Sequence, residues 1–328
     1  MRDGPDPPGS GGDVRLGVIS NPRSGGNRRG IAAVRRILAG RPRTCHFETT
    51  AASEVGPVLD ELAAGKINVL AVNGGDGTIH AVLTEIFRRP GPPPLLAILR
   101  SGTTSMIAGD VGLRGSRESA LRRLLAWADK GRFTPGVVER SVLRVDGALD
   151  QRTLYGMFFG MAGICRGIRF CHTRVYTRGL GGELAAGVTL LRFLALAVRG
   201  NRRLFTVPVR VSLDGAPPEE RSLLLALVSS LERLFLGLRP YWGGGTGPLH
   251  YSAVAARPRH FTASLPALLS GRRGRFLGPE NGYVSRNIHE VRLSFSGDLA
   301  VDGELYRADS RVGPVTVKEG GKVFFLKL

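Results

Sequence analysis

The sequence predicts an α/β protein in two parts: an N-terminal α/β domain with a parallel sheet, and a C-terminal, mainly antiparallel β-sandwich-like domain. In the first third of the chain, short apolar runs alternate with segments whose apolar residues recur at helical spacing, which is typical of βα units. After residue 131, most apolar runs are strand-like and are separated by turns such as Asp-Gly, which is typical of hairpins. At 328 residues, the chain also exceeds the usual size of one domain.

The elements of the first part follow from their patterns. Strands are expected at short apolar runs, and helices where apolar residues lie three or four positions apart. Ser53 is expected to be the N-cap of the second helix. The expected strands are 14–19, 45–49, 67–73 and 95–99, and the expected helices are 30–38, 53–64 and 79–87. Such repeated units imply a mainly parallel sheet with helices on both faces.

The second part is expected to be rich in strands, with one helix at 181–199. The expected strands are 138–145, 153–159, 204–213, 222–229, 250–256 and 289–295. Asp146-Gly147 and Asp214-Gly215 predict hairpin turns. We therefore divide the chain into a disordered tail at 1–12, an α/β nucleotide-binding domain at 13–133 and a β-rich domain at 134–311.

Composition restricts the function without defining it. The net charge of +19 comes from arginine, because only five lysines are present. Such a protein is attracted to nucleic acids and to anionic membranes alike, so the charge alone does not choose a partner. The longest apolar stretch, 180–198, carries Glu183 and Arg192 and is too interrupted to span a bilayer. Three irregularly spaced cysteines and the absence of a signal peptide pattern indicate a cytoplasmic protein.

A glycine-rich loop, Gly74-Gly75-Asp76-Gly77-Thr78, joins an expected strand to an expected helix. Ligands of open α/β sheets bind at this end of the strands. Glycines allow the backbone to approach a polyanion, and the helix offers free N–H groups to phosphate. A carboxylate in such a loop needs a magnesium ion or a hydroxyl proton to act on, so Asp76 indicates phosphoryl transfer. An ordinary βα turn with Asp76 as an N-cap is the alternative.

Two further loops follow neighbouring strands. Residues 21–27 form a turn that Pro22 stiffens and glycines open. Residues 101–106 contain hydroxyl side chains and a glycine that could line a nucleotide, although a helix start capped by Ser101 or Thr103 explains them equally well. The chain has neither a P-loop motif nor a Gly-x-Gly-x-x-Gly motif between a strand and a helix, which argues against P-loop ATPases and dinucleotide dehydrogenases.

A last candidate segment lies near the C-terminus. Asp302-Gly303 predicts a hairpin turn. Glu304 follows directly and is a carboxylate that could act as a general base.

The segments 21–25, 74–78, 102–103 and 302–304 occur in the order and approximate spacing of the diacylglycerol kinase catalytic family, which this chain resembles over residues 14–328. That family includes bacterial diacylglycerol and lipid kinases, sphingosine kinases and ceramide kinases. The Gly-Gly-Asp-Gly-Thr motif is shared with NAD kinases and 6-phosphofructokinases. The first and last segments together favour the lipid branch.

The resemblance implies ATP and Mg2+ as cofactors. Asp76 would serve the metal or the substrate hydroxyl, and Glu304 would deprotonate the lipid alcohol before in-line attack on the γ-phosphate. The residues that would contact the nucleotide and its phosphates are Asn21, Pro22, Arg23, Ser24, Gly25, Thr50, Gly74, Gly75, Asp76, Gly77, Thr78, Gly102 and Thr103.

The same resemblance implies a fold in which ATP lies between two domains and the segment 312–328 returns to the first. The expected substrate is a hydroxyl-bearing lipid, such as diacylglycerol or a sphingoid base, at an anionic membrane to which the protein binds peripherally. A homodimer is a possible assembly. A nucleic-acid partner is disfavoured, because interleaved aromatic residues and a recognition-helix motif are missing.

Two departures from the family pattern keep alternatives open. The third loop of the family usually reads Gly-Thr-x-Asn-Asp, whereas Ser105-Met106 stands here, with Asp110 as a candidate substitute for the missing aspartate. The late Asp-Asp-Gly segment of many members is also missing where residues 247–251 stand, which affects a structural magnesium site. The alternatives are an enzyme resembling NAD kinase and a catalytically impaired protein that binds nucleotide or lipid.

Overall fold

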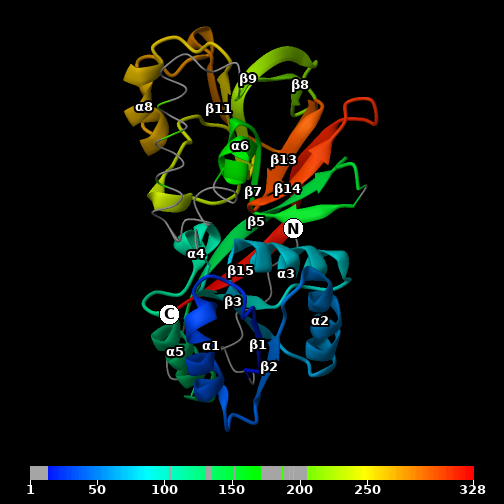
Figure 1. Cartoon of the computed structure of the whole chain (residues 1–328), viewed down its shortest axis with the longest axis vertical. Coiled ribbons are helices and arrows are strands. Elements are labelled where there is room, and N and C mark those ends of the chain that lie inside the picture. The colour runs from blue at the N-terminus through cyan, green and yellow to red at the C-terminus, as the bar shows by residue number, and fades with distance from the viewer. Residues whose placement is uncertain are drawn as a thin grey trace. The chain divides into compact units, whose positions relative to one another are not determined.

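The computed structural model describes residues 14–102, 105–130, 135–150, 152–170, 187, 192, 195 and 205–328. The chain forms two compact units: unit 1 is Met1–Arg140 with Lys322–Leu328, and unit 2 is Ser141–Gly321 (Figure 1). The tail expected at 1–12, nearly all of the helix expected at 181–199, and Thr103 lie outside the described residues.

Unit 1 is a parallel sheet covered by helices on both faces. Its first elements are β1 (Leu16–Ser20), α1 (Asn27–Leu38), β2 (Thr44–Glu48), η1 (Ala52–Glu54), α2 (Val55–Ala64) and β3 (Val69–Gly74). They are followed by α3 (Asp76–Arg88), β4 (Leu95–Arg100), α4 (Met106–Val111) and α5 (Arg117–Lys130). The strand order is β2-β1-β3-β4, and every neighbouring pair is parallel.

The strands of unit 1 are apolar on both sides because each face of the sheet meets a helix pair. Val18 and Ala71 point to one face, where they share a core with α1 and α5. Gly17 points to the other face, where a Cβ would come within 2.7 Å of the Leu62 side chain of α2. Continuous apolar strands such as β3, which is buried throughout, are therefore expected in this layered arrangement.

Ser53 does not cap the second helix as predicted, since it lies inside η1 and α2 begins at Val55. The backbone N–H of Thr50 donates to Glu54 Oε2 at 2.6 Å, and the Thr50 hydroxyl donates to Glu54 Oε1 at 3.1 Å. This local pair turns the chain before the helix starts.

Unit 2 is built from antiparallel strands. Its described elements are β6 (Leu154–Gly156), β7 (Phe158–Ala162), α6 (Gly163–Phe170), β8 (Val207–Leu213), β9 (Glu219–Ser229), η5 (Phe235–Gly237), β10 (Leu249–Ala255), α8 (Phe261–Ser270), η6 (Pro279–Asn281), β11 (Tyr283–Ile288), β12 (Glu290–Ser294), β13 (Gly297–Val301) and β14 (Glu304–Ala308). The main order is β14-β13-β7-β9-β8-β12, and β10 joins β9 to β11. Together with the parallel sheet of unit 1, these strands confirm the predicted fold class.

Two long strands run from one unit into the other. β5 (Gly136–Asp146) leaves unit 1 and pairs with β6 in unit 2. β15 (Val315–Lys327) pairs antiparallel with β12 in unit 2, and its Phe325 lies beside Leu96 of β4 in unit 1, in parallel. Among the residues described, no helix combines the length and apolar character that crossing a bilayer requires.

Two of the three predicted Asp-Gly turns are found. Asp146-Gly147 is not a tight hairpin turn, because Asp146 is still part of β5 and β6 begins only at Leu154. Asp214 and Gly215 have φ of 49° and 77° and connect the antiparallel strands β8 and β9. Asp302 and Gly303 have φ of 48° and 94° and connect β13 to β14. Aspartate and glycine accept this left-handed backbone more easily than other residues, which is why the pair marks a hairpin so clearly.

Candidate active site

Three loops of unit 1 converge at the carboxyl ends of β1, β3 and β4. The parallel register sets Ser20 beside Asn73 and Gly74 beside Arg100, so these strands end at the same edge of the sheet. The loop after β1 is joined to the loop after β4 by a hydrogen bond from Gly26 N–H to the Ser101 carbonyl, at 2.8 Å. The loops that the sequence singled out separately therefore form one structure.

Glycines allow the backbones of these loops to touch. A Cβ on Gly102 would lie 2.6 Å from Gly75 Cα, and a Cβ on Gly75 would lie 3.2 Å from Gly102 Cα. A Cβ on Gly26 would lie 3.0 Å from the Ser101 oxygen. Since no side chain separates the loops at these points, backbone amides can form the wall of an anion site.

Asn21 acts as a brace between two of the loops. Its Nδ2 donates to the Thr78 hydroxyl at 3.0 Å, and its Oδ1 accepts the backbone N–H of Arg23 at 2.8 Å. The Ser24 hydroxyl donates to the Asn21 carbonyl at 3.0 Å. Three residues expected to contact nucleotide, Asn21, Ser24 and Thr78, therefore also hold the loops in place.

Asp76 links the loop after β3 to helix α4. Its Oδ2 accepts the backbone N–H of Met106 at 2.9 Å, and its Oδ1 accepts that of Ile107 at 3.0 Å. The carboxylate thus satisfies two amides of the first turn of α4, and it also lies in the first turn of α3, where negative charge is favourable. Asp76 is half-buried and does not point into solvent. The sequence did not indicate its bond to Met106, which lies 30 residues away.

The residues that replace the Asn-Asp pair of relatives have defined roles. Ser105 has a left-handed backbone with φ of 46°, a conformation that asparagine adopts more easily than serine. Its hydroxyl donates to the Gly102 carbonyl at 2.8 Å. Met106 is buried, and Asp110, the candidate substitute, bonds Arg140 Nε through Oδ2 at 3.0 Å. Asp110 is therefore engaged in an ion pair with β5.

Beneath the loops lies a buried polar network whose contacts sequence reasoning did not predict. Asn73 Nδ2 donates to the Ser20 hydroxyl at 2.9 Å, and the Ser101 hydroxyl donates to Asn73 Oδ1. Asn27 Nδ2 donates to the carbonyls of Asn21 and Asn73 at 2.8 and 2.9 Å. Asn27 and Asn73 are fully buried, so their amides fix the loop positions from below. The available signal was a polar residue ending a buried apolar strand.

Arg117 of α5 was also missed. Its Nη1 donates to the Gly26 carbonyl and to Asn27 Oδ1, both at 2.8 Å. The guanidinium passes over Gly30, where a Cβ would lie 1.8 Å from Nη2. Arg117 thus braces the loop after β1 from a helix about 90 residues away in sequence, a contact that no local pattern indicates.

His46 extends the polar network to β2, and its Nε2 lies 2.9 Å from the Ser20 hydroxyl. Burial lowers the pKa of His46; Glu48 opposes this effect and Arg35 adds to it. The folded state favours the neutral ring. The contribution of His46 to the free energy of unfolding is therefore fully present above the ordinary histidine pKa of about 6.5, and it is lost as the pH falls toward the lowered pKa.

We therefore expect His46→Gln to reduce the acid sensitivity of unfolding. The difference in thermal midpoint between about pH 7.5 and about pH 5.5, either side of the ordinary pKa, should be smaller in the variant. His289→Gln is the matched control, because His289 is exposed. Equal acid sensitivity in the parent and both variants would contradict the assignment.

Three other predicted nucleotide contacts are exposed at the surface of unit 1. Thr50 is exposed, and its hydroxyl is engaged by Glu54. Arg23 and Gly25 are exposed in the loop after β1, and Pro22 is half-buried there. Arg23 therefore has a guanidinium at the surface of the loop.

In unit 2, Asp302 and Glu304 differ in role. Asp302 is buried, and its Oδ1 accepts the backbone N–H groups of Met157 and Phe158 at 3.0 and 2.9 Å. Gly156 makes room for it, since a Cβ there would lie 2.3 Å from Asp302 Oδ2. Glu304 opens β14 and is exposed, and no hydrogen bond or ion pair to its carboxylate occurs among the described residues. Asp302 is a structural residue, whereas the Glu304 carboxylate is available for chemistry.

Comparison with known proteins agrees with this geometry. The diacylglycerol kinase catalytic domain model matches residues 15–131, which contain all three loops. These residues match the diacylglycerol kinase catalytic domain family. No curated protein matches the chain.

Three solved structures from Bacillus anthracis str. Sterne, assigned as diacylglycerol kinases, share the fold of the whole chain. The first is 17% identical with a TM-score of 0.65, and the match covers 97% of this chain and 98% of the other. The second is 15% identical with a TM-score of 0.60 and coverage of 95% and 96%. The third is 18% identical with a TM-score of 0.60 and coverage of 96% and 97%. At these identities, the likeness extends to the fold alone.

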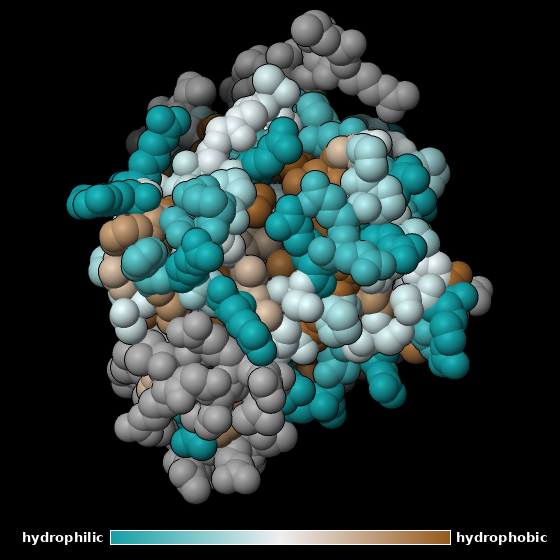
Figure 2. All heavy atoms as spheres, turned by 90° about the horizontal axis from the view of Figure 1, so that it is seen from above, coloured by the Kyte–Doolittle hydropathy of each residue, from teal (hydrophilic) through white to brown (hydrophobic). Residues whose placement is uncertain are grey.

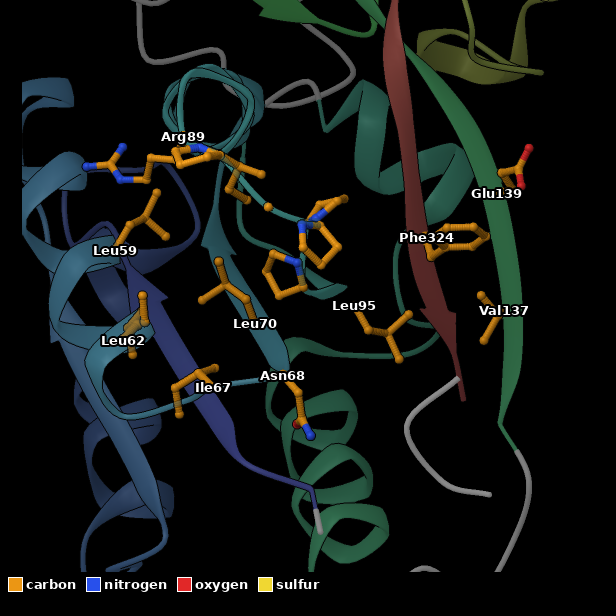
Figure 3. Close-up of a pocket in the computed structure, with 17 residues that line it drawn as sticks. Leu59, Leu62, Ile67, Asn68, Leu70, Arg89, Leu95, Val137, Glu139 and Phe324 are labelled. Atoms are coloured by element: carbon orange, nitrogen blue, oxygen red, sulfur yellow. The ribbon is translucent and has the colours of Figure 1, made fainter. Parts of the chain in front are cut away.

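A cavity of about 690 Å³ lies elsewhere in unit 1. Leu59, Leu62 and Leu70 line one side, and Val137 and Phe324 line the other (Figure 3). Since Asn68 and Leu95 also border it, the cavity is at the amino ends of β3 and β4, opposite the loops.

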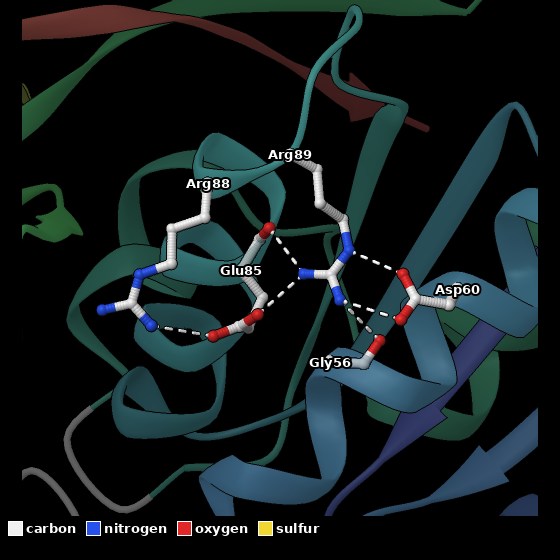
Figure 4. A network of polar contacts seen from close by, with 5 residues as sticks. All are labelled: Gly56, Asp60, Glu85, Arg88 and Arg89. Atoms are coloured by element: carbon white, nitrogen blue, oxygen red, sulfur yellow. Dashed lines mark hydrogen bonds and ion pairs between the residues drawn. The ribbon is translucent and has the colours of Figure 1, made fainter.

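The basic residue of this cavity, Arg89, is occupied by neighbouring groups. Its Nε donates to Asp60 at 2.8 Å, its Nη1 to Glu85 Oε2 at 2.7 Å, and its Nη2 to the Gly56 carbonyl at 2.8 Å (Figure 4). The guanidinium therefore ties α3 to α2. The cavity is mainly apolar, and its lining does not favour a phosphate ligand.

Proposed function

We propose that this chain is an ATP-dependent lipid kinase that transfers the γ-phosphate to the hydroxyl of a lipid such as diacylglycerol or a sphingoid base. The observation that carries the proposal is a diacylglycerol kinase catalytic domain whose three strand-end loops meet at glycines around the Asp76 carboxylate. We assign the nucleotide to unit 1 and the lipid to unit 2.

The loops fit a nucleotide triphosphate. The first turn of α3, a helix of 13 residues, presents N–H groups next to the contact between Gly75 and Gly102. Asn21, Ser24 and Thr78 add polar side chains at the same edge. Such donors bind phosphate oxygens, and the absence of side chains at the glycine contact lets the phosphates approach the backbone.

Magnesium also fits, with Asp76 as its protein ligand. Mg2+ bound to phosphates commonly uses one or two carboxylates and keeps several waters, and it would neutralise charge that develops on the phosphates. Asp76 has lone pairs beyond those used by the two amides. The described ranges contain no cluster of three or more His, Cys, Asp or Glu side chains suited to a metal, so phosphate and water must supply the remaining ligands.

In the proposed reaction, Glu304 accepts the proton of the lipid hydroxyl while the hydroxyl oxygen attacks the γ-phosphorus. The bond between the γ-phosphorus and the bridging oxygen of the β-phosphate breaks, and ADP leaves. The loops after β1, β3 and β4 hold the phosphates in line for this attack. Because Ser105 and Met106 replace the Asn-Asp pair after β4, Asp76 is the carboxylate that these loops offer to the metal. The metal and the position of α4 therefore depend on the same side chain.

The deciding experiment supplies ATP labelled in the γ-phosphate together with a total lipid extract, and identifies the product that acquires label. Label in diacylglycerol or a sphingoid base is expected. Label in NAD, tested in parallel, would instead support the alternative resembling NAD kinase. ATP binding without ADP formation on any lipid would support an impaired binding protein and would contradict the proposal.

Arg117→Ala tests the brace on the loop after β1. Removal of the guanidinium leaves the Gly26 carbonyl and Asn27 Oδ1 without their donor, which costs about 1–3 kcal/mol locally. We expect KM for ATP to rise about tenfold, with little change in kcat. A tenfold rise corresponds to a loss of about 1–2 kcal/mol of ATP binding free energy when the loop is less ordered. Arg122→Ala, an exposed arginine of the same helix, is the control. A fall in kcat with an unchanged KM would contradict a positioning role.

A further inference from the structure

Unit 2 carries a surface on which one exposed leucine and one half-buried leucine lie among exposed arginines. We call it the Leu–Arg surface. It consists of Arg233, Leu236, Leu238, Arg239, Arg272 and Arg273. The first four belong to the loop between β9 and β10, and the last two follow α8. Figure 2 shows a face of the molecule on which hydrophilic side chains project around patches of hydrophobic surface.

Leu236 occupies the tip of a tight turn. Leu234 N–H donates to the Leu238 carbonyl at 2.8 Å, and Gly237 N–H donates to the Leu234 carbonyl at 3.1 Å. Leu236 has φ of 58° and is 46% exposed. A bulky side chain in the left-handed region is unfavourable, yet Leu236 is held there with 46% of its surface exposed. The turn therefore displays a leucine outward.

The turn is fixed to the end of α8. Arg239 N–H donates to the Leu269 carbonyl at 3.0 Å. Gly271 permits this approach, since a Cβ there would lie 2.2 Å from the Arg239 oxygen. Leu269 packs against a buried cluster beneath. The leucine and the arginines of the two segments are thus held together as one surface.

The arginines of this surface differ from several others in unit 2. Arg210, Arg292 and Arg311 each form an ion pair with a neighbouring carboxylate. No hydrogen bond or ion pair of the Arg233, Arg239, Arg272 or Arg273 guanidinium is found among the described residues. Glu232 is the one acidic residue within the loop and cannot neutralise four positive charges.

We infer that the Leu–Arg surface docks unit 2 onto an anionic lipid bilayer. Leu236 enters the headgroup boundary, and the guanidinium groups bind lipid phosphates. Arginine favours phosphate, but the exposed leucine requires an apolar medium beside the negative charge, which a bilayer offers and a nucleic acid does not. The choice of partner rests on the proposed function, because a kinase of membrane lipids must reach its substrate at the bilayer.

The test is sedimentation with vesicles of phosphatidylcholine alone and of phosphatidylcholine with phosphatidylglycerol in equal parts. The parent should bind the anionic vesicles more tightly. Loss of one leucine at the boundary should weaken binding about tenfold, and loss of each arginine about fivefold. The variants are Leu236→Ser, Leu236→Gly, which suits the left-handed backbone, and Arg272→Gln with Arg273→Gln.

The controls remove the same groups elsewhere in unit 2. Val312→Ser replaces a valine that is 62% exposed, and Arg210→Gln with Arg292→Gln removes the same charge. The controls should bind as the parent does, with an unchanged thermal midpoint confirming folding. Equal binding by all variants, or tighter binding to duplex DNA than to anionic vesicles, would overturn the inference.

A catalytic assay separates this inference from the proposed function. With a short-chain, water-soluble diacylglycerol, Leu236→Gly should retain the parent rate, whereas with anionic vesicles its rate should fall in proportion to binding. If the parent phosphorylates no lipid but the pattern of vesicle binding holds, membrane docking stands and the proposed reaction does not.

Discussion

Replacement of Asp76 by alanine is expected to reduce lipid phosphorylation below detection. The change removes the carboxylate proposed to serve Mg2+, and it also leaves the N–H groups of Met106 and Ile107 without their acceptor. Hydrogen bonds to a charged acceptor contribute about 1.5–3 kcal/mol, so unfolding free energy should fall by about 1–3 kcal/mol. Phosphate transfer and chemical denaturation measure the two effects separately.

Asp76→Asn separates the chemical role from the structural one. Asparagine retains one oxygen acceptor for α4 but carries no charge, so part of the stability should return while turnover should not. Glu61→Gln, at an exposed position of α2, is the matched control and should leave both quantities unchanged. If turnover recovers together with stability in Asp76→Asn, then the role of Asp76 is only to hold helix α4 in place.

The arrangement of the loops could be predicted because it depends on local patterns and one rule of topology. β3 is a continuous apolar run that ends in glycines, so both the strand and the turn after it are visible in the sequence. The carboxyl ends of parallel strands connected by helices lie at the same edge of the sheet. This rule alone predicts that residues 21–26 lie beside residues 74–78. The Asp302-Gly303 turn was visible for a similar reason, since its backbone requirements are local.

The support for these loops could not be predicted, because it comes from distant residues. Arg117 reaches Gly26 across 91 positions, and the sequence around it resembles any charged helix. The role of Asp302 likewise depends on the amides of Met157 and Phe158, which lie more than 140 positions away. The sequence explains Asp302 by its hairpin turn alone, and only the structure shows that the buried carboxylate also holds these two amides.

This division of roles leads to the expectation for Glu304→Gln. The amide keeps the shape of the side chain but cannot accept a proton, and general base catalysis contributes about a hundredfold to ten-thousandfold in rate. We expect kcat for lipid phosphorylation to fall within this range, while ATP affinity and thermal stability stay near parent values because Glu304 is exposed and unbonded among the described residues. Single-turnover phosphate transfer and nucleotide titration measure these quantities.

Asp302→Ala and Glu220→Gln complete the comparison. Loss of the Asp302 carboxylate leaves two buried amides unsatisfied, so it should lower stability by about 1–3 kcal/mol. Glu220→Gln, at an exposed position on β9, should change neither rate nor stability. The two neighbouring acidic residues would then be distinguished, because Asp302→Ala lowers stability whereas Glu304→Gln lowers the rate of phosphate transfer. An unchanged single-turnover rate in Glu304→Gln would remove Glu304 from the base role and require another proton acceptor for the lipid hydroxyl.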